Sequence, residues 1–486
     1  MATRPAVVHR HAHAFGWLHG QEREGLTLTT RRGMLKASMA GVAGLTLPRL
    51  LRARAEAAAA GNPLRGRKSV ILLWMAGGPS HIDTWDPKPD RPYENRGPFG
   101  TISTKVPGVQ IIEHLPKQAA MLDKLTIIRS VDARHSGHAT TYKVFQTGSI
   151  AANRNINPKA ELVPAMGAVA AKYRGAKHPA MPPYVAFMTS PGHIAFGGFL
   201  GKQYDPFIGQ QAARLPVYTN VGVDTGEIRG GALFGLPAGL TGERLEDRRS
   251  LLRQFDRLRA DVDVRGSMQA LDSYSQQAVD MVLGKQAQEA FDLDREPQSS
   301  RDRYGKHLWC QEALLARRLV EAGVAFVTLD LSYHPSSGTW DTHGDNIPPY
   351  GGIRRGLGPL LPLFDHLTTT LISDLDERGL LDDTLVLAMG EFGRTPQLGT
   401  QGSTDGRGHW PVVMSMLLAG GGLRHGQVIG ATESDGGQIL ERPVTPGDLA
   451  ATVYQHLGVP LDTTYVDDTG RPIHIVQNGA PLRELF

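Results

Sequence analysis

Cysteine is nearly absent from this sequence, because Cys310 is the one cysteine among 486 residues. A single thiol excludes a disulfide within the chain and any metal cluster built from several cysteines. The other common ligands of divalent metals are imidazoles and carboxylates. A metal site in this protein would therefore consist of histidine, aspartate and glutamate side chains.

Long apolar runs are also lacking. The apolar stretch at residues 37–47 is shorter than the roughly 20 residues that a membrane-spanning helix requires. We therefore expect no stable membrane span. No internal repeat and no low-complexity linker follows residue 62, and a hydrophobic content of 41% is sufficient for a sizeable core. Residues 61–486 are accordingly predicted to form a single domain.

The positive charge of the chain is not spread along its length. Residues 1–55 contain nine Lys and Arg against two acidic residues, so the remainder has 43 basic and 46 acidic residues. A basic face for nucleic acid needs its positive charge on the folded domain. The charge distribution therefore does not favour a nucleic-acid partner.

The basic N-terminal segment resembles an export signal. Residues 30–36, "TRRGMLK", precede a weakly hydrophobic stretch, and small residues follow at residues 53–57. This order is typical of a twin-arginine signal; a short amphipathic helix with a basic start is the alternative. We expect a disordered extension at 1–26 and a twin-arginine signal at 27–60. The translocation machinery would then be a partner, and the protein would be periplasmic or extracellular.

The body of the chain alternates buried strands with helices. Continuous apolar runs bounded by glycine and polar residues predict strands, and amphipathic spacing predicts helices, including a helical insertion at about 235–310. Such alternation indicates an α/β fold with a mainly parallel sheet and helices on both faces. The expected strands are residues 69–75, 126–128, 324–330, 384–389 and 412–418, and the expected helices include 114–125, 139–146, 357–378 and 445–458.

Four loops that follow these strands carry dense functional side chains. In parallel sheets, chemistry concentrates in loops beyond the carboxyl ends of the strands. We therefore expect these loops to converge on a divalent metal, with Zn²⁺ first and Ca²⁺, Mn²⁺ or Mg²⁺ as alternatives. The candidates are His81 and Asp83 in the first loop, His135 and His138 in the second, His334, Asp341, His343 and Asp345 in the third, and Glu391, Arg394 and His409 in the fourth.

Each candidate also has a purely structural interpretation. His81 and Asp83 could form a surface turn, and the two histidines before the helix at 139–146 could cap it. Glu391 ends a buried strand, where an unpaired carboxylate is costly, so Arg394 could be its structural partner. The pair Asp341 and His343 is the strongest candidate, because two residues apart in a loop both can face one ion.

Several motifs resemble known families. The stretch "LPLFDHLTTTLISDLDERGLLDDTLVLAMGEFG" and the unit "HLPKQAAMLDKLTIIRSV" are similar to segments of sulfatases and alkaline phosphatase relatives. A closer resemblance is to a bacterial family of the planctomycete type, domain of unknown function 1501, through "GGPSHIDTWDPKP", "GTWDTHGDN", "GEFGRTP", "GHWP", "LAGGG" and "RPVTPGDLAATVYQHLG". It covers about residues 65–480. It implies a three-layer alkaline phosphatase-like fold and a two-metal hydrolase ancestry.

The chain also departs from the sulfatase pattern. The first strand ends in Met75-Ala-Gly-Gly where those enzymes have a metal-binding aspartate, and Glu391-Phe392 replaces the usual Asp followed by His or Asn. Alignment with the resembling enzymes places their nucleophile at His138, with Thr140 close by. Cys310 lacks the surrounding signature, so formylglycine sulfatase chemistry is not expected.

The resemblance and the residues together lead to one functional hypothesis. We expect an exported hydrolase of phosphate or sulfate esters that uses one or two metal ions. Its substrate would be an anionic ester, including carbohydrate-linked esters. A non-catalytic ligand-binding or structural protein on the same fold is the alternative. In the hydrolase, the metal ligands would be Asp341, His343, Glu391 and His409, with His81 and Asp83 as additions; the catalytic residues would be His138, Thr140 and His135, with Arg394 holding an anionic oxygen.

Overall fold

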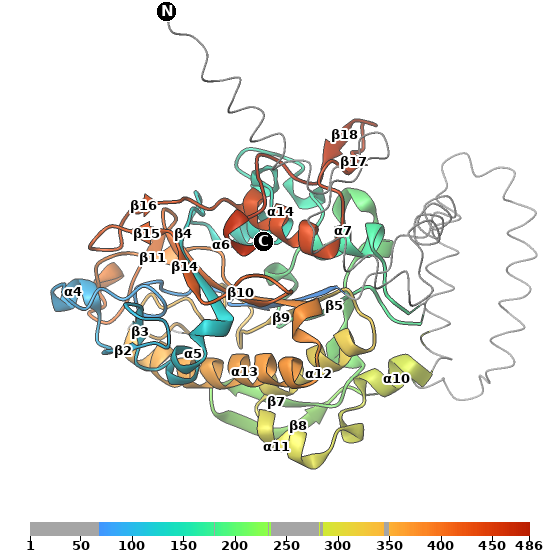
Figure 1. The fold of residues 1–486 in the computed structure, drawn as a ribbon, viewed down its shortest axis with the longest axis horizontal. Helices are drawn as coiled ribbons and strands as arrows, with labels where there is room; N and C mark the ends of the chain where they lie inside the picture. Colours follow the sequence, from blue (N-terminus) through green and yellow to red (C-terminus); the bar gives the residue numbers. More distant parts are fainter. Residues whose placement is uncertain (1–67, 179, 232, 235–280, 282–284, 345–348) are drawn as a thin grey trace, which may run out of the picture. The chain divides into compact units, whose positions relative to one another are not determined.

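The computed structural model describes residues 68–178, 180–231, 233–234, 281, 285–344 and 349–486 (Figure 1). The predicted extension and export signal at 1–60, most of the predicted insertion, and Asp345 lie outside the described residues. Residues from Arg65 to Phe486 form one compact unit. Within the described part of the chain, no helix is long and apolar enough to cross a membrane.

An eight-stranded sheet forms the centre of this unit. Seven of its strands are parallel to at least one neighbour, and β13 is antiparallel to both of its neighbours. The mainly parallel sheet predicted from the apolar runs is therefore confirmed. The strand order is β14 (Gln427–Ile429), β4 (Leu125–Val131), β13 (Met414–Gly420), β10 (Thr384–Met389), β1 (Ser69–Trp74), β9 (Phe326–Asp330), β5 (Tyr184–Phe187) and β6 (Phe207–Ile208).

Helices cover both faces of the sheet, as predicted (Figure 1). Successive residues of β1 face opposite sides. Ile71 and Leu73 belong to one hydrophobic core, and Val70 and Leu72 belong to the other. The first core contains α5 (Pro116–Ala120), α12 (Leu308–Glu321) and α13 (Gly358–Glu377), and the second contains α6 (His138–Thr147), α7 (Met166–Tyr173) and α14 (Pro446–Leu457).

The ends of α14 follow directly from its sequence. The Thr445 side chain accepts a hydrogen bond from the backbone N–H of Asp448, and the Asp448 carboxylate accepts one from the backbone N–H of Thr445. This reciprocal pair is a capping box, which satisfies two backbone donors at once. Pro446 occupies the first turn, and Gly458 ends the helix with φ of 72°. These boundaries confirm the predicted ones.

The described part of the predicted insertion is helical and is fixed to the domain by buried charges. It contains α10 (Lys285–Phe291) and α11 (Gln298–Tyr304) and lies beside the hairpin of β7 (Leu215–Asn220) and β8 (Val223–Arg229). Arg317 of α12 is fully buried and pairs with Glu296 at 2.6 Å and with Asp374 of α13 at 2.9 Å. This network holds the segment against α12 and α13.

Short elements complete the fold around the sheet. Most of them are two-stranded antiparallel sheets. These elements are α4 (Tyr93–Arg96), β2 (Thr101–Ser103) with β3 (Gln110–Ile112), β11 (Gly393–Arg394) with β12 (His409–Trp410), β15 (Ala431–Thr432) with β16 (Ile439–Glu441), and β17 (Thr464–Val466) with β18 (Pro472–His474). The pair β11 and β12 joins the two halves of the fourth predicted loop, because Arg394 pairs with His409.

The carboxyl ends of three neighbouring strands meet at one edge of the sheet. Trp74 at the end of β1 is aligned with Met389 of β10 on one side and with Asp330 of β9 on the other. The loops after these strands are the first, third and fourth of the predicted functional loops. Strand pairing therefore brings segments more than 250 residues apart in sequence to the same place.

Candidate metal centre

Four side chains converge at this edge of the sheet. His138, Asp341, His343 and His409 each offer one potential ligand atom, and these atoms all lie within 4.8 Å of one another. His138 begins α6, His409 begins β12, and the other two belong to the loop after β9. We call residues 331–344 the metal loop. Three of the four predicted strand-end loops thus contribute to one cluster.

Two glycines allow the loops to approach this closely. Gly77 has φ of 114°, and a Cβ there would lie 2.8 Å from the carbonyl carbon of Trp340. Gly338 has φ of 99°, and a Cβ there would lie 2.7 Å from the Cβ of Ala76. Both contacts are too short for a side chain, and positive φ disfavours any other residue. The glycines after β1 and before Trp340 are therefore required for the metal loop to pack against β1.

His138 lies between two carboxylates. Its Nδ1 is 2.7 Å from Glu391 Oε1, and its Nε2 is 3.2 Å from Asp341 Oδ2. Burial opposes protonation of the ring, but hydrogen bonds to Asp341 and Glu391 outweigh it and raise the pKa of His138. The same Glu391 oxygen accepts the backbone N–H of Gly77 at 2.9 Å. Glu391 therefore fixes the orientation of the ring while the opposite nitrogen faces the cluster.

The backbone fixes the ring of His409 in the same way. Its Nδ1–H donates to the carbonyl oxygen of Ser136 at 2.6 Å. In the neutral ring this leaves the lone pair on Nε2, which lies 2.8 Å from His343 Nε2 and 3.6 Å from Asp341 Oδ1. Burial lowers the pKa of His409, and the Asp341 carboxylate offsets this in part. The ring is thus held neutral with its free nitrogen facing the cluster.

Asp341 is the central carboxylate of the group. Its Oδ1 accepts a hydrogen bond from Arg394 and lies 3.0 Å from His343 Nε2, and its Oδ2 accepts the hydroxyl of Ser337 at 2.6 Å. Burial alone would raise the pKa of Asp341, but the Arg394 guanidinium and the surrounding imidazoles hold it well below its usual range. Arg394 and the imidazoles therefore favour the ionised form of Asp341.

Arg394 is fully buried, and its donors are directed at the protein. They bond to Asp341, to the carbonyl oxygens of Gly77 and Gly78, and to the carbonyl oxygen of Arg407. We expected this side chain to hold an anionic oxygen of the substrate. The geometry instead makes it a positioning residue that joins the loop after β1 to Asp341.

The aromatic side chain of the "GEFGRTP" motif packs against the cluster. The ring of buried Phe392 lies 4.8 Å from the centroid of His138 and 4.5 Å from that of His409. An apolar wall beside two imidazoles limits the water around them and strengthens electrostatic interactions there. Glu391, Phe392 and Arg394 of this motif therefore each contact one or two of the four cluster side chains.

The predicted residues of the first loop lie elsewhere. Asp83 is buried and pairs with Arg407 at 2.6 Å. His81 is buried with Nε2 2.9 Å from the carbonyl oxygen of Gly436, and burial lowers its pKa to about 4. Neither residue belongs to the group of four, although both were expected to bind metal. Their contacts make this loop a buried structural turn.

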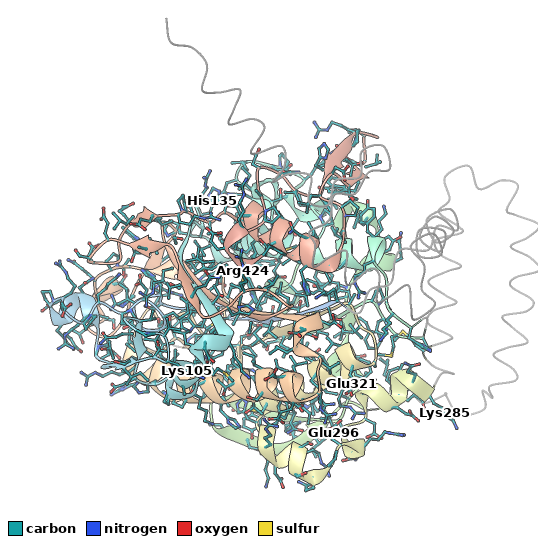
Figure 2. All side chains as sticks on the ribbon, in the orientation of Figure 1. Lys105, His135, Lys285, Glu296, Glu321 and Arg424 are labelled. Atoms are coloured by element: carbon teal, nitrogen blue, oxygen red, sulfur yellow. The ribbon has the colours of Figure 1, made fainter. Side chains whose placement is uncertain are left out.

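The other predicted residues lie close to the cluster without joining it. His135, half-buried on the loop before α6 (Figure 2), and Thr140, buried in α6, flank His138 in sequence. His334 lies near the start of the metal loop, before Asp341, with Nδ1 3.0 Å from Ser336 Oγ. Glu391 contacts Nδ1 of His138, the ring nitrogen that faces away from the other three cluster residues. None of these residues is among the four whose atoms converge.

Two side chains that support the cluster were not predicted from the sequence. Ser337 donates its hydroxyl to Asp341, and the Tyr350 hydroxyl lies 2.8 Å from Ser337 Oγ. Both belong to the Ser- and Pro-rich part of the third loop and its continuation, which gave only a general loop signal. The carbonyl of Ser136 had no signal at all, because every residue has a carbonyl.

The four side chains fit a divalent metal ion. Imidazole nitrogens and carboxylate oxygens are both ordinary ligands of Zn²⁺, and zinc sites most often have four ligands. Ligating histidines usually donate their second nitrogen to a carboxylate or a backbone carbonyl, which orients the ring. His138 and His409 have these two partners, in Glu391 and Ser136. His343 Nδ1 is buried and has no hydrogen-bond partner among the described residues.

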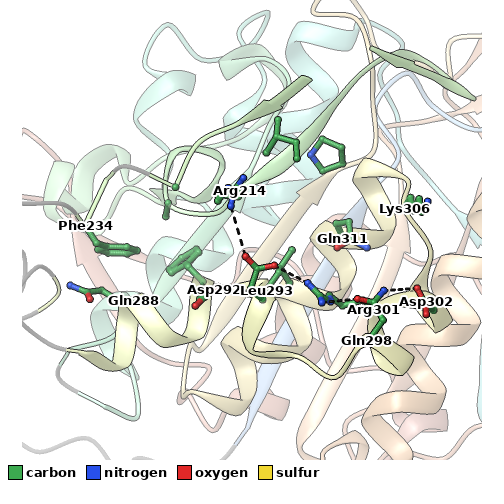
Figure 3. Close-up of a pocket in the computed structure, with 16 residues that line it drawn as sticks. Arg214, Phe234, Gln288, Asp292, Leu293, Gln298, Arg301, Asp302, Lys306 and Gln311 are labelled. Carbon is green, nitrogen blue, oxygen red and sulfur yellow. Dashed lines mark hydrogen bonds and ion pairs between the residues drawn. The ribbon is translucent and has the colours of Figure 1, made fainter. Parts of the chain in front are cut away.

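A separate cavity of about 620 Å³ lies away from this cluster (Figure 3). It is bounded by the β7–β8 hairpin and by the α10–α11 segment, and none of the four cluster residues lines it. Positive and negative side chains alternate around it, among them Arg214, Asp294 and Arg301, and several are paired with one another. The cavity therefore has no excess charge of either sign.

Comparisons with known proteins place the chain in a family. No curated protein matches it. It is similar to the lipoteichoic acid synthase LtaP from Listeria monocytogenes (10% identity, 82% of this chain and 73% of that one, TM-score 0.32). It is also similar to the phosphonate monoester hydrolase of Agrobacterium radiobacter (14% identity, 85% of this chain and 76% of that one, TM-score 0.35). A third similar structure is the PsFucS1 sulfatase from Pseudoalteromonas sp. (11% identity, 84% of this chain and 70% of that one, TM-score 0.32). Because these similarities are weak, the side chains of the site must decide its chemistry. Residues 67–486 match the family described as "Protein of unknown function (DUF1501)", and the chain belongs to that family.

Proposed function

We propose that this protein is a metal-dependent hydrolase of phosphate or sulfate esters. One divalent ion, with Zn²⁺ as the first candidate, would be bound by Asp341, His138, His343 and His409. The observation that carries this proposal is the orientation of the imidazoles. The ring nitrogens of His138 and His409 that face away from the cluster are anchored by Glu391 and by the Ser136 carbonyl, so the opposite nitrogens face one point.

The surrounding residues suit such a reaction. A bound ion would supply Lewis acidity toward an ester oxygen and a nucleophilic water at neutral pH. Arg394 holds Asp341 in place, and Phe392 shields the imidazoles. Both nitrogens of His138 face carboxylates, so we assign it to metal binding and not to the nucleophile role that the resemblance implied.

We further propose an anionic ester as substrate, including carbohydrate-linked esters, and export by the twin-arginine route. The motif resemblance to sulfatases and alkaline phosphatase relatives supports the ester class. The Arg31-Arg32 pair with the apolar stretch behind it supports export. The translocation machinery would then be a partner, and the protein would act in the periplasm or outside the cell.

One observation favours a different function. Without a metal, the two carboxylates Asp341 and Glu391 are balanced by Arg394 and a protonated His138, whose pKa is raised. Such a cluster is a buried ion-pair network whose two negative and two positive charges balance. It would stabilise the fold of a non-catalytic ligand-binding protein without any bound metal.

Elemental mass spectrometry separates the two functions. We expect about one equivalent of metal in the full-length protein purified without chelators. The Asp341→Ala, His343→Ala double variant should contain almost none. His456→Asn is the control, because His456 is equally buried but bonds to the Ser69 carbonyl far from the cluster. Absence of metal from the wild type, even after incubation with Zn²⁺, Mn²⁺ and Ca²⁺, would leave the ligand-binding function.

Turnover then tests the hydrolase itself. A metal-loaded wild type should release phosphate or sulfate from aryl and sugar esters, and the double variant should not. A folded wild type that contains the metal and cleaves none of these esters would contradict the hydrolase proposal.

A further inference from the structure

A second buried imidazole–carboxylate pair lies beside the metal loop. His193 ends a short 3-10 turn, Pro191–His193, after β5, and Asp330 is the last residue of β9. The two residues are 5% and 2% exposed, and His193 Nδ1 lies 2.9 Å from Asp330 Oδ2. Neither residue belongs to the group of four, and the reaction proposed above does not use them.

Both ring nitrogens of His193 face acceptors. While Nδ1 faces Asp330, Nε2 lies 3.3 Å from the carbonyl oxygen of Ser336. A ring that donates from both nitrogens is the protonated imidazolium. Burial opposes the charge, but the Asp330 carboxylate outweighs it and raises the pKa of His193. The ring therefore bridges the end of β9 and the middle of the metal loop.

Further hydrogen bonds join residues 189–193 to the end of β9 and to the start of the metal loop. The backbone N–H of Thr189 donates to Asp330 Oδ2 at 3.0 Å, and its hydroxyl donates to the carbonyl oxygen of Ser332 at 2.7 Å. The Ser332 hydroxyl itself lies 3.2 Å from His193 Nδ1. Residues 189–193 thus hold the first half of the metal loop at several points.

This attachment leads directly to the metal centre. The carbonyl of Ser336, which faces His193, is followed by Ser337, and the Ser337 hydroxyl donates to Asp341 Oδ2 at 2.6 Å. Displacement of the Ser336 peptide would therefore move the hydroxyl that positions Asp341. Partners behind metal ligands commonly set metal affinity in this way.

We propose that His193 and Asp330 are positioning residues for the metal centre. They hold the metal loop so that Asp341 and His343 face the imidazoles of His138 and His409. This inference rests on the metal site of the proposed function. Asp330 Oδ1 is buried and has no hydrogen-bond partner among the described residues, so the charge of Asp330 depends on His193 for compensation. The pair thus acts as a unit, and loss of either member loosens the loop.

Substitution of His193 by asparagine tests the inference in the full-length chain. The amide nitrogen of Asn approximates Nδ1, so His193→Asn can retain the bond to Asp330 while it loses the bond to Ser336. Asp330→Asn removes the charge that the imidazolium faces. His456→Asn is the matched control, because His456 is also 5% exposed and its Nε2 is 2.9 Å from a backbone carbonyl, that of Ser69.

Two measurements decide the outcome. In the metal-free proteins, hydrogen exchange should be faster at residues 331–344 in both His193→Asn and Asp330→Asn, and unchanged there in the control. In competition titrations, the Zn²⁺ dissociation constant should rise about 10- to 100-fold in the two variants. Unchanged exchange and affinity in both variants, or equal changes in His456→Asn, would overturn the inference. If the wild type binds no Zn²⁺, the proposed function fails, and the exchange data alone decide whether the pair holds the loop.

Discussion

Glu391 affects the cluster without providing one of its four converging atoms. One of its oxygens accepts hydrogen bonds from Gly77 and from His138, and its other oxygen is buried and has no hydrogen-bond partner among the described residues. A buried carboxylate in this position increases the basicity of the histidine that it contacts and selects which nitrogen faces the metal. The strength of the metal site should therefore depend on a negative charge at residue 391.

The substitution Glu391→Gln should weaken metal binding about 10- to 100-fold. The amide retains the shape of the side chain and an oxygen for the Gly77 N–H, but it no longer offers a negative acceptor to His138. A competition titration with a chromophoric chelator measures the change in the Zn²⁺ dissociation constant. Glu484→Gln is the control, since Glu484 pairs with Arg442 at the surface. Equal affinity in wild type and Glu391→Gln would show that the carboxylate does not support the ligand.

The charge of His193 should make metal-free stability depend on pH. Its pKa is raised in the folded state, mainly by Asp330, with a smaller contribution from Glu391. The stabilisation is thus complete below the unfolded value of about 6.5 and is lost as the pH rises through the folded value. Urea unfolding from about pH 5 to about pH 8 measures this. The difference in unfolding free energy between wild type and His193→Asn should shrink as the pH rises. A difference that grows with pH would contradict this assignment.

The sequence indicated the types of residue in the cluster better than their roles. His81-x-Asp83 and Asp341-x-His343 have the same spacing, but Asp83 is paired with Arg407, which is 324 residues away in sequence. No local pattern reveals such a partner. The anchor of His409 is a backbone carbonyl, which has no residue signature. Distinguishing a ligand from a structural side chain therefore required the tertiary structure.

At the scale of elements, the loops depend on glycine to approach one another. Gly338 and Gly108 both have positive φ, 99° and 79°, but they differ in their surroundings. A Cβ on Gly338 would collide with the backbone and side chain of Ala76, whereas a Cβ on Gly108 would meet nothing within 4 Å. The two positions therefore separate the cost of backbone conformation from the cost of a steric clash.

Gly338→Ala should destabilise the protein more than Gly108→Ala does. Positive φ alone costs a non-glycine residue about 1–2 kcal/mol, and this is the whole effect expected at Gly108. At Gly338 the clash adds to that cost and displaces the metal loop, so Zn²⁺ affinity should fall as well. Urea unfolding and the chelator titration measure the two effects. Similar losses of stability in both variants, with unchanged affinity, would mean that the loop tolerates the displacement.

Elements with a strong apolar pattern were predictable, and those without one were not. Five strands of the central sheet, β1, β4, β9, β10 and β13, contain the continuous apolar runs that predicted them, whereas β5, β6 and β14 were not predicted. The direction of each strand could not be predicted, because an apolar run looks the same for a parallel and an antiparallel strand. The sequence therefore did not distinguish the antiparallel β13 from the parallel strands of the sheet. All seven residues of β8 are exposed, so the β7–β8 hairpin has no alternating apolar pattern. Its pairing depends on backbone hydrogen bonds that the sequence does not encode locally.

At the scale of the whole molecule, the cluster links distant parts of the chain. His138, the metal loop and His409 are brought together because the sheet places β4, β9 and β10 in one layer. The fold class followed from the alternation of strands and helices, but which strand ends would be neighbours depends on strand order, and a single sequence does not specify it. The export signal concerns residues 1–60, outside the described residues, and stays a prediction.

An ion bound between these segments should stabilise the entire domain. A ligand that binds only the folded state adds RT ln(1 + [L]/Kd), about 2.7 kcal/mol when free Zn²⁺ is about 100-fold above its dissociation constant. The melting temperature of the metal-free wild type should then rise by several degrees on addition of Zn²⁺, because about 1 kcal/mol shifts it by about 2–4 °C in domains of 150–250 residues. Calorimetry of the wild type and of the Asp341→Ala, His343→Ala variant measures the shift.

The variant should melt lower than the wild type even without metal, because Arg394 loses its buried carboxylate partner, and it should not respond to Zn²⁺. An equal rise in both proteins would mean that Zn²⁺ binds elsewhere. His138 and Arg394 would then only form ion pairs with Asp341 and Glu391, and these ion pairs would join the loops without a metal.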